Sequence, residues 1–315
     1  MSVSIKDWQK ILKQDNIKMA EPLKAHTTFK IGGLADWFLT PTSITQLAKI
    51  VALCKEKQVN YFVLGAGSNC LAKDTGFAGV VISTEKLKAV KVEDNVVVAY
   101  AGARLSKIVS TCLEKKLSGF EFAVGIPASC GGAVFMNAGA FGHQIADIVE
   151  DVFVLSDGKI KKLKASECGF GYRLSRFKES KEIIVKATFK LKPAPASLIL
   201  EKMQDYFSRR SKTQPFCASA GSVFKKTENF PAGFLIEQAG LKGLSIGDAK
   251  VSTKHANFIV NVCNATASQV LQLIDIIKNE VYLQFGIKLE LEIILIGEKD
   301  ENTRGLSYSQ HIQQV

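Results

Sequence analysis

The sequence of 315 residues is poor in the side chains that build metal centres and disulfide-linked folds. Its seven cysteines are widely spaced and contain no C-x-x-C pair, and its four histidines contain no H-E-x-x-H cluster. This spacing argues against a zinc ribbon, a dithiol redox centre and a zinc protease. We therefore expect no bound metal, and free thiols that act mostly as small buried hydrophobic residues.

Long apolar runs are lacking as well. No stretch approaches the roughly 18 consecutive apolar residues that a membrane-spanning helix needs. Residues Met1 to Trp8 are too polar for the apolar segment of a secretory signal. Hydrophobic residues make up 47% and charged residues 23% of the chain, which is typical of globular proteins. We expect a cytoplasmic protein of about two domains without a membrane span.

Negative charge is in short supply, because 41 lysines and arginines face 30 acidic residues and leave a net charge of +11. Such an excess favours anionic partners. The basic residues are scattered in short pairs such as Lys115-Lys116 and Arg209-Arg210. A nucleic-acid-binding protein more often gathers them on one arm or helix among exposed aromatic residues. The charge therefore favours anionic small molecules and no nucleic acid, with a basic nucleic-acid-binding protein as the alternative of another class.

Hydrophobic periodicity predicts helices and strands that alternate before residue 193. Apolar residues at helical spacing predict amphipathic helices at 43–58 and 105–112. Short apolar or alternating runs predict strands at 61–64, 80–82, 89–99 (a hairpin), 152–155, 159–163 and 183–191. The alternation in the last of these predicts a half-buried strand. Pro193 and Pro195 then mark the expected domain boundary.

Two helices are predicted beyond this boundary. One lies near 198–207 and is followed by a long loop through Gly221 and Ser222. The other begins at Thr266, where a capping box precedes an apolar stripe, and ends at Gly286.

A further strand is predicted at 287–296, and it contains two glutamates, Glu290 and Glu292. Strict alternation places Glu292 on one face together with Ile294 and Ile296, opposite a fully apolar face. A carboxylate beside isoleucines on one strand face is unusual. The remaining residues, 298–315, form a polar tail that we expect to be mobile.

Two glycine-rich segments are candidates for phosphate binding. The first, Gly65 to Asn69, follows a predicted strand, and its backbone N–H groups could bind a pyrophosphate. It matches neither the Walker loop nor the G-x-G-x-x-G pattern, so an ordinary turn is the alternative. The second, Gly125 to Gly142, has five glycines within 18 residues. Such a segment favours close backbone approach to a ligand, or else a tight crossover packed on small residues. Together they suggest a dinucleotide lying across both loops, in a fold other than the Rossmann fold.

Three residues are candidates for acid–base and charge-stabilising chemistry. Arg173 could bind a substrate carboxylate through two parallel hydrogen bonds. Ser222 could deliver a proton to a developing carbanion if its own conjugate base is stabilised nearby, and Glu292 is the third candidate. The alternatives are a surface arginine, a serine that caps a turn and an exposed strand glutamate, and spacing alone favours these alternatives. Ser222 lies in no nucleophile-elbow pattern, which argues against a catalytic triad.

Taken in order, the motifs are more specific than any single one. Together they closely resemble those of the UDP-N-acetylenolpyruvoylglucosamine reductase family over about residues 20 to 297. The segments that carry the resemblance are HTTFKIGG (26–33), LGAGSN (64–69), GIPASCGGAVFMNAG (125–139), GYRLSRF (171–177), SAGSVF (219–224), AGFLIEQAGLKG (232–243) and VSTKHANFIVN (251–261).

The resemblance implies an α+β fold and a reductase activity. It implies an FAD-binding domain of the vanillyl-alcohol-oxidase type at 1–195, with lobes at about 1–84 and 85–195, and a smaller α+β substrate-binding domain at 196–297. The implied reaction is the NADPH-dependent, FAD-mediated reduction of UDP-N-acetylglucosamine enolpyruvate to UDP-N-acetylmuramate for peptidoglycan synthesis. Another FAD-dependent oxidoreductase with the same cofactor fold, such as an alcohol oxidase, is the alternative.

The resemblance also implies roles for particular residues. Ser222 corresponds to the family's proton donor, and Arg173 and Glu292 correspond to the pair that stabilises the intermediate. Substrate binding is implied for Tyr172, Lys212 and Lys225. We expect a monomer. FAD binding is implied for Gly65, Ala66, Gly67, Ser68, Asn69, Gly125, Ile126, Pro127, Ser129, Gly132, Asn137, Gly139 and Val185.

Two subtypes of this family exist, and one carries an insertion with a tyrosine over the substrate. Here Phe177 leads almost directly into the predicted strand at Ile183, which indicates the shorter subtype. Two positions depart from the family pattern. Lys226 replaces an asparagine used near the uridine diphosphate, and Ile294 replaces an arginine shortly after Glu292.

Overall fold

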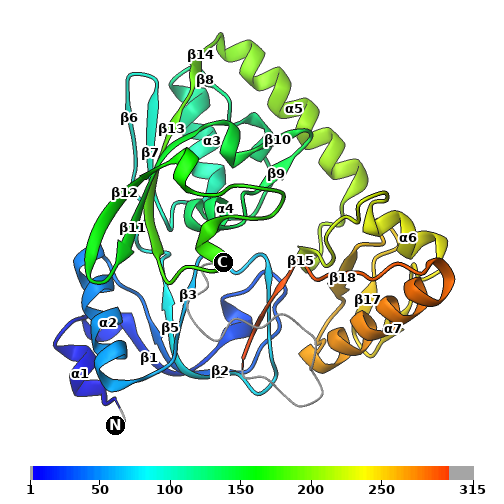
Figure 1. Ribbon diagram of the computed structural model, residues 1–315, viewed down its shortest axis with the longest axis horizontal. Coiled ribbons are helices and arrows are strands. Elements are labelled where there is room, and N and C mark those ends of the chain that lie inside the picture. Colours follow the sequence, from blue (N-terminus) through cyan, green and yellow to red (C-terminus); the bar gives the residue numbers. More distant parts are fainter. Residues whose placement is uncertain (1–2, 298–315) are drawn as a thin grey trace.

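The computed structural model describes residues 3–297, which fold into three units (Figure 1). The first unit is built on a four-stranded sheet in the order β1-β2-β5-β3, in which β1 is antiparallel and β5 is parallel to both neighbours. The predicted helix at 43–58 is confirmed, and the Ser43 side chain caps its first turn. The elements of this unit are α1 Ile5–Gln9, β1 Ile17–Pro22, β2 Leu34–Leu39, α2 Ile44–Lys57, β3 Tyr61–Leu64, β4 Cys70–Ala72 and β5 Phe77–Ser83.

The second unit is an antiparallel five-stranded sheet in the order β12-β11-β13-β7-β6. Two helices, α3 and α4, share a hydrophobic core with this sheet. The predicted hairpin at 89–99, the strands at 152–155 and 159–163 and the helix at 105–112 are confirmed. The elements are β6 Val90–Glu93, β7 Val96–Tyr100, α3 Leu105–Glu114, β8 Leu117–Ser118, α4 Cys130–Phe135, β9 Gly139–Ala140, β10 His143–Gln144, β11 Val149–Ser156, β12 Lys159–Lys164, β13 Ile183–Lys190 and β14 Lys192–Pro193.

The prediction that β13 is half-buried is wrong. All of its residues except Lys186 and Lys190 are buried. The reason is its central position, since Phe189 packs in the core with α3 and α4, while Ile183 and Val185 pack in the core of the first unit. Burial on both faces of a central strand hides the alternation expected from one solvated face.

The third unit is a four-stranded antiparallel sheet in the order β15-β18-β17-β16. It shares its core with the long helix α7, whose predicted capping box at Thr266 and end at Gly286 are confirmed. The helix predicted near 198–207 is longer than expected and runs beside the second unit (Figure 1). The elements are α5 Ala196–Thr213, β15 Ala218–Ser222, α6 Ala232–Gln238, β16 Ser245–Ile246, β17 Ala249–Val251, β18 Phe258–Asn261, α7 Ala267–Phe285 and β19 Ile294–Ile296.

The long loop predicted through Gly221 and Ser222 is instead the end of strand β15. Its composition of alanine, serine and glycine has little intrinsic preference for a strand. Pairing with β18 holds it in place, and a register shift between Ser219 and Ser222 accommodates the left-handed backbone of Gly221, with φ of +76°. Tertiary pairing therefore overrides a composition typical of loops.

The last described segment corrects the prediction of one strand over 287–296. Only β19 forms a strand there, and it pairs in parallel with β4 of the first unit. Because the segment crosses from the third unit to the first, both of its sides are covered. Glu292 is consequently buried at 8% exposure, not exposed. The predicted mobile tail, 298–315, lies outside the described residues.

The cysteines follow the expectation of free thiols. All seven are unpaired, and five are buried whereas Cys217 and Cys263 are exposed. Burial raises the pKa of the Cys54 and Cys70 thiols to about 12, so both remain protonated at neutral pH. Within residues 3–297, no helix is both long and apolar enough to cross a membrane.

A carboxylate of the first unit caps a helix of the third. Asp74 follows β4 and accepts hydrogen bonds from the backbone N–H groups of Ala267 (2.8 Å) and Ser268 (2.9 Å), at the start of α7. We expect Asp74→Ala to lower the free energy of unfolding by about 1 kcal/mol, since a lost N-terminal cap typically costs that much. Chemical denaturation measures the change.

Thr266→Ala provides the matched comparison, because the Thr266 hydroxyl caps the same helix within the third unit. Both variants should lose similar stability, but only Asp74→Ala should increase hydrogen exchange at the contact between β4 and β19. Equal exchange there in both variants would contradict a linking role for Asp74.

Candidate active site

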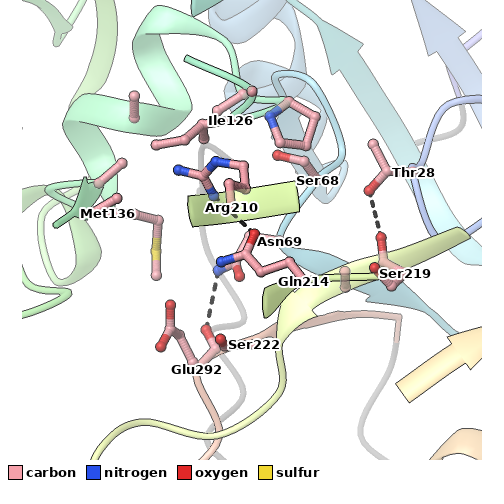
Figure 2. Close-up of a pocket in the computed structure, with 18 of the residues that line it drawn as sticks. Thr28, Ser68, Asn69, Ile126, Met136, Arg210, Gln214, Ser219, Ser222 and Glu292 are labelled. Atoms are coloured by element: carbon pink, nitrogen blue, oxygen red, sulfur yellow. Dashed lines mark hydrogen bonds between the residues drawn. The ribbon is translucent and has the colours of Figure 1, made fainter. Parts of the chain in front are cut away.

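Two cavities meet between the three units. The first, of about 600 Å³, is lined by the loop after β3, the segment around α4, the end of α5 and strand β15 (Figure 2). The second, of about 500 Å³, lies against the third unit. Three residues line both cavities, and they are Arg173, Ser222 and Glu292. The structure therefore brings together the three side chains singled out for catalysis, at the junction of the two spaces.

Arg173 and Glu292 form a short ion pair, with 2.6 Å between Nε and Oε1. Arg173 also donates from Nη1 to the carbonyl oxygen of Gly139 at 3.3 Å. Its backbone is left-handed, with φ of +53°, within a tight turn from Gly171 to Leu174. A non-glycine residue held in this conformation costs energy, and such residues concentrate at functional sites. The interpretation of Arg173 as a surface arginine is thus wrong.

The protonation of Glu292 is governed by its burial. Burial raises the pKa of this carboxyl above its ordinary value, although Arg173, Lys178 and Lys225 oppose the shift. Lys178 is a neighbour that the sequence analysis missed, because nothing in its spacing distinguishes it from surface lysines. Burial lowers the pKa of Lys178 to about 8, with the like charge of Lys225 as a second cause. Burial thus shifts both Glu292 and Lys178 toward their neutral forms.

The backbone next to Ser222 is hydrogen-bonded to the segment that carries Glu292. The carbonyl oxygen of the next residue, Val223, accepts the backbone N–H of Glu292 at 2.8 Å. The N–H of Val223 in turn donates to the carbonyl oxygen of Asn257 at 2.8 Å. Ser222 therefore lies one residue from a hydrogen bond that ties β15 to the Glu292 segment. The interpretation of Ser222 as the cap of a turn is wrong, since it ends a paired strand.

The first glycine loop divides into lining and supporting residues. Ser68 and Asn69 line the first cavity (Figure 2). Asn69 also donates from its side chain to the carbonyl oxygen of Glu292 at 3.1 Å. Gly65, Ala66 and Gly67 do not line the cavity and form the turn behind it. The loop thus joins the cavity wall to the catalytic segment.

Gly67 is required by this turn. Its φ is +65°, and a Cβ there would lie 2.2 Å from the carbonyl oxygen of His26. We expect Gly67→Ala to unfold the loop or lower the free energy of unfolding by about 3 kcal/mol or more, because both the backbone angle and the clash oppose it. Gly158→Ala is the control, since Gly158 has φ of +75° but a Cβ at this position would meet no other atom within 4 Å.

The control should lose only about 1 kcal/mol from backbone strain. Thermal unfolding of both variants measures the difference. Similar losses in the two would show that close packing at Gly67 is unimportant.

The second glycine segment lines the first cavity with six of the predicted residues. They are Gly125, Ile126, Pro127, Ser129, Gly132 and Gly139. Asn137 does not line it, but its side chain donates to the carbonyl oxygen of Gly171 at 2.8 Å and accepts from the N–H of Ala146 at 2.9 Å. It thereby holds the turn that carries Arg173. Val185 lies away from the cavity, in the core of the first unit.

The second cavity is lined by cations. Tyr172 and Lys212 line it as predicted, whereas Lys225 does not and pairs with Glu290 at 2.9 Å. Lys226 lines the cavity, with its ammonium 4.7 Å from the centre of the Tyr172 ring. Lys254, which the sequence analysis missed, is a further lining residue. These three lysines and Arg173 outnumber the two lining carboxylates, Glu237 and Glu292, and the positive excess favours an anionic ligand.

The first cavity fits a large anionic cofactor. Its volume lies within the range of ligand pockets. Glycines of the second segment leave backbone exposed to it, and the buried guanidinium of Arg210 in its wall has a terminal nitrogen, Nη2, without a hydrogen-bond partner among the described residues. A buried unpaired cationic donor is costly unless a ligand or water satisfies it. The chemistry of the wall therefore suits a diphosphate-bearing cofactor.

The α+β fold and its two adjoining cavities, one suited to an anionic cofactor and one to a second anionic ligand, are the arrangement of a cofactor-dependent enzyme. Residues 35–164 match the family model described as FAD binding domain, so this enzyme is a flavoprotein. Residues 212–296 match the family model of the UDP-N-acetylenolpyruvoylglucosamine reductase C-terminal domain. The chain belongs to the UDP-N-acetylenolpyruvoylglucosamine reductase family.

Individual relatives agree along most of the chain. The reductase of Clostridium kluyveri is 43% identical over 92% of this chain and 96% of the relative, and that of Clostridium novyi is 42% identical over 94% and 97%. The crystal structure of the reductase (MurB) from Thermus caldophilus is 36% identical, with a TM-score of 0.77 over 89% of this chain and 98% of that one. The predicted α+β fold, with an FAD-binding domain before a smaller domain, is confirmed.

Proposed function

We propose that this protein reduces the enolpyruvyl group of UDP-N-acetylglucosamine enolpyruvate to give UDP-N-acetylmuramate, a step in peptidoglycan-precursor synthesis. The observation that supports it most is the position of Arg173, Ser222 and Glu292 between a cofactor cavity and a cation-lined cavity. Bound FAD, reduced by NADPH, supplies the hydride for this chemistry. Hydride transfer needs cofactor and substrate in contact, and this junction is where two bound molecules can meet.

Each of the three residues has a distinct role. Ser222 Oγ delivers the proton to the substrate carbon that bears the carboxylate. Arg173 stabilises the negative charge that develops on this carboxylate. Glu292 holds the guanidinium in place through its 2.6 Å contact at Nε. A fixed guanidinium requires no reorganisation when charge develops, which is the source of its benefit.

The two cavities hold the two ligands. Ser68, Asn69 and the backbone from Gly125 to Gly139 would hold FAD in the first cavity. Tyr172 and Lys212 would hold the UDP-sugar in the second, joined there by Lys226 and Lys254. Lys225 lies outside this cavity and pairs with Glu290, so we assign it no direct contact with the sugar nucleotide. Lys226 places a cation where the family pattern has an amide.

Several finer assignments belong to the same proposal. The short path from the turn at Gly171 through the 3-10 turn Arg176–Lys178 to β13 supports the shorter subtype, without the tyrosine insertion. We divide the chain into an FAD-binding domain at 1–195, with lobes at 1–84 and 85–195, and a substrate-binding domain at 196–297. The separate four-stranded and five-stranded sheets before residue 195 support the two lobes. We propose that the protein acts as a monomer.

The visible absorption spectrum of the purified protein tests the function. We expect bound oxidised flavin that bleaches with NADPH and recovers anaerobically when the enolpyruvyl sugar nucleotide is added. An oxidase with the same cofactor fold would instead recover rapidly with oxygen and would not respond to the UDP-sugar. A colourless protein that takes up no added FAD would contradict the proposal.

A further inference from the structure

Arg210 is a buried cation in the wall of the first cavity that no sequence motif indicated. It lies in the last turn of α5 and is 7% exposed (Figure 2). Its Nε donates to the carbonyl oxygen of Val124 at 3.1 Å, and its Nη1 donates to the side chain of Gln214 at 2.9 Å. The guanidinium carbon lies 5.4 Å from the centre of the Phe141 ring. These contacts fix the plane of the guanidinium but use only part of its five N–H donors.

The remaining donor group is unsatisfied. Nη2 of Arg210 is buried and has no hydrogen-bond partner among residues 3–297. The charged residues that line this cavity are Arg173, Glu292 and Arg210, and the first two are paired with each other. No carboxylate in the wall therefore balances Arg210. A buried cation without a counter-charge is costly, and a permanently anionic ligand removes that cost.

The second glycine segment makes room for this arginine. A Cβ at Gly125, whose φ is +76°, would lie 2.9 Å from Cδ of Arg210. The absence of a side chain thus lets the arginine lie against the backbone of the predicted cofactor loop. The glycine at position 125 is therefore explained both by the close approach of Arg210 and by the left-handed backbone at Gly125.

Resting on the proposed binding of FAD in this cavity, we propose that Arg210 binds the diphosphate of FAD through Nη2. The diphosphate is anionic whether the flavin is oxidised or reduced, so it supplies the permanent counter-charge that Arg210 lacks. A planar guanidinium matches the geometry of phosphate oxygens better than an ammonium does. Arg210 is thus a positioning residue for the cofactor, distinct from the three residues at the junction of the cavities.

FAD titration of the full chain, with its flavin removed and returned, tests this role through binding and not through turnover. We expect Arg210→Gln to raise the Kd for FAD by about 10- to 100-fold, the range for a lost hydrogen bond to a charged group. Arg210→Lys, which keeps the charge without the fork, should show a smaller loss. Arg209→Gln is the matched control, because the side chain of Arg209 is next to Arg210 in the sequence but is 60% exposed and pairs with Asp205. Its Kd should match that of the unchanged protein.

Two further ligands identify the group that Arg210 binds. ADP carries the diphosphate without the flavin, and riboflavin carries the flavin without the diphosphate. Arg210→Gln should weaken ADP, measured as a competitor of FAD, by the same factor as FAD, and should leave riboflavin binding unchanged. Weakened riboflavin binding with unchanged ADP binding would overturn the proposal in favour of a contact with the flavin ring.

The remaining outcomes separate this inference from the proposed function. Unchanged FAD affinity in Arg210→Gln, with normal binding by the unchanged protein, would overturn the role of Arg210 alone. Failure of the unchanged protein to bind FAD would overturn the proposed function. If Arg210→Gln does not fold, Arg210→Lys provides the test. An FAD affinity of Arg210→Lys equal to that of the unchanged protein would show that the forked guanidinium is not needed, and would overturn the proposal.

Discussion

Replacing Ser222 by alanine is expected to separate the two halves of the reaction. Reduction of the bound flavin by NADPH should proceed at the rate of the unchanged protein, because Ser222→Ala leaves the cofactor cavity otherwise intact. Reoxidation of the flavin by the enolpyruvyl sugar nucleotide should slow by about 10²- to 10⁴-fold, the usual contribution of a positioned proton donor. Anaerobic stopped-flow absorption of the flavin measures both rates in one preparation.

The same strand provides a matched control for this experiment. Ser219 lies three residues before Ser222 in β15 and also lines the first cavity, but it lies outside the second. Ser219→Ala should leave both half-reactions unchanged within about twofold, well below the 10-fold step that corresponds to roughly 1.4 kcal/mol. Reoxidation at the normal rate in Ser222→Ala would eliminate the serine as the proton donor.

The helices and their ends could be predicted from the sequence because their signals are local. Ser43 and Thr266 each accept a hydrogen bond from a backbone N–H three residues later, and both caps are readable from residue types alone. The left-handed end of α7 at Gly286 is equally local. The ordered motifs likewise carried the family resemblance, since they fix the residues at the two cavities.

The surroundings of Glu292 could not be predicted in the same way. Its burial depends on the return of the chain to the first unit, where Asn69, 223 positions earlier, donates to its carbonyl oxygen. Strand alternation predicts which residues share a face, but it does not say what covers that face. Arg210 escaped notice for a similar reason. It looks like part of a basic surface pair, and only its contact with Val124, 86 positions earlier, shows that it is buried.

Exchanging Glu292 for glutamine should slow the enzyme without weakening the fold. The amide has nearly the same shape but lacks the negative charge that holds Arg173 through the 2.6 Å contact. We expect flavin reoxidation by the sugar nucleotide to slow by about 10²- to 10³-fold, the usual cost of losing a preorganised charge-stabilising group. Glu290→Gln is the control, since Glu290 lies two residues earlier, is 74% exposed and pairs with Lys225 outside the cavity.

The stability of Glu292→Gln follows from the raised pKa of Glu292, which burial causes. The folded chain holds the Glu292 proton more tightly than the unfolded chain does, so the ionised carboxylate destabilises the fold at a pH above its folded pKa. This penalty fades as the pH falls through the raised pKa and is absent below the ordinary carboxyl value, where both states are protonated.

Glu292→Gln should therefore unfold at an equal or higher temperature than the unchanged protein at about pH 8, and the gap should close toward pH 4. The opposite result is a Glu292→Gln variant that is less stable than the unchanged protein at pH 8, with a smaller difference at pH 4. That result would mean that the ion pair with Arg173 outweighs burial. The opposite and expected trend would identify Glu292 as a carboxylate kept at a cost in stability because the chemistry at the junction of the two cavities requires its charge.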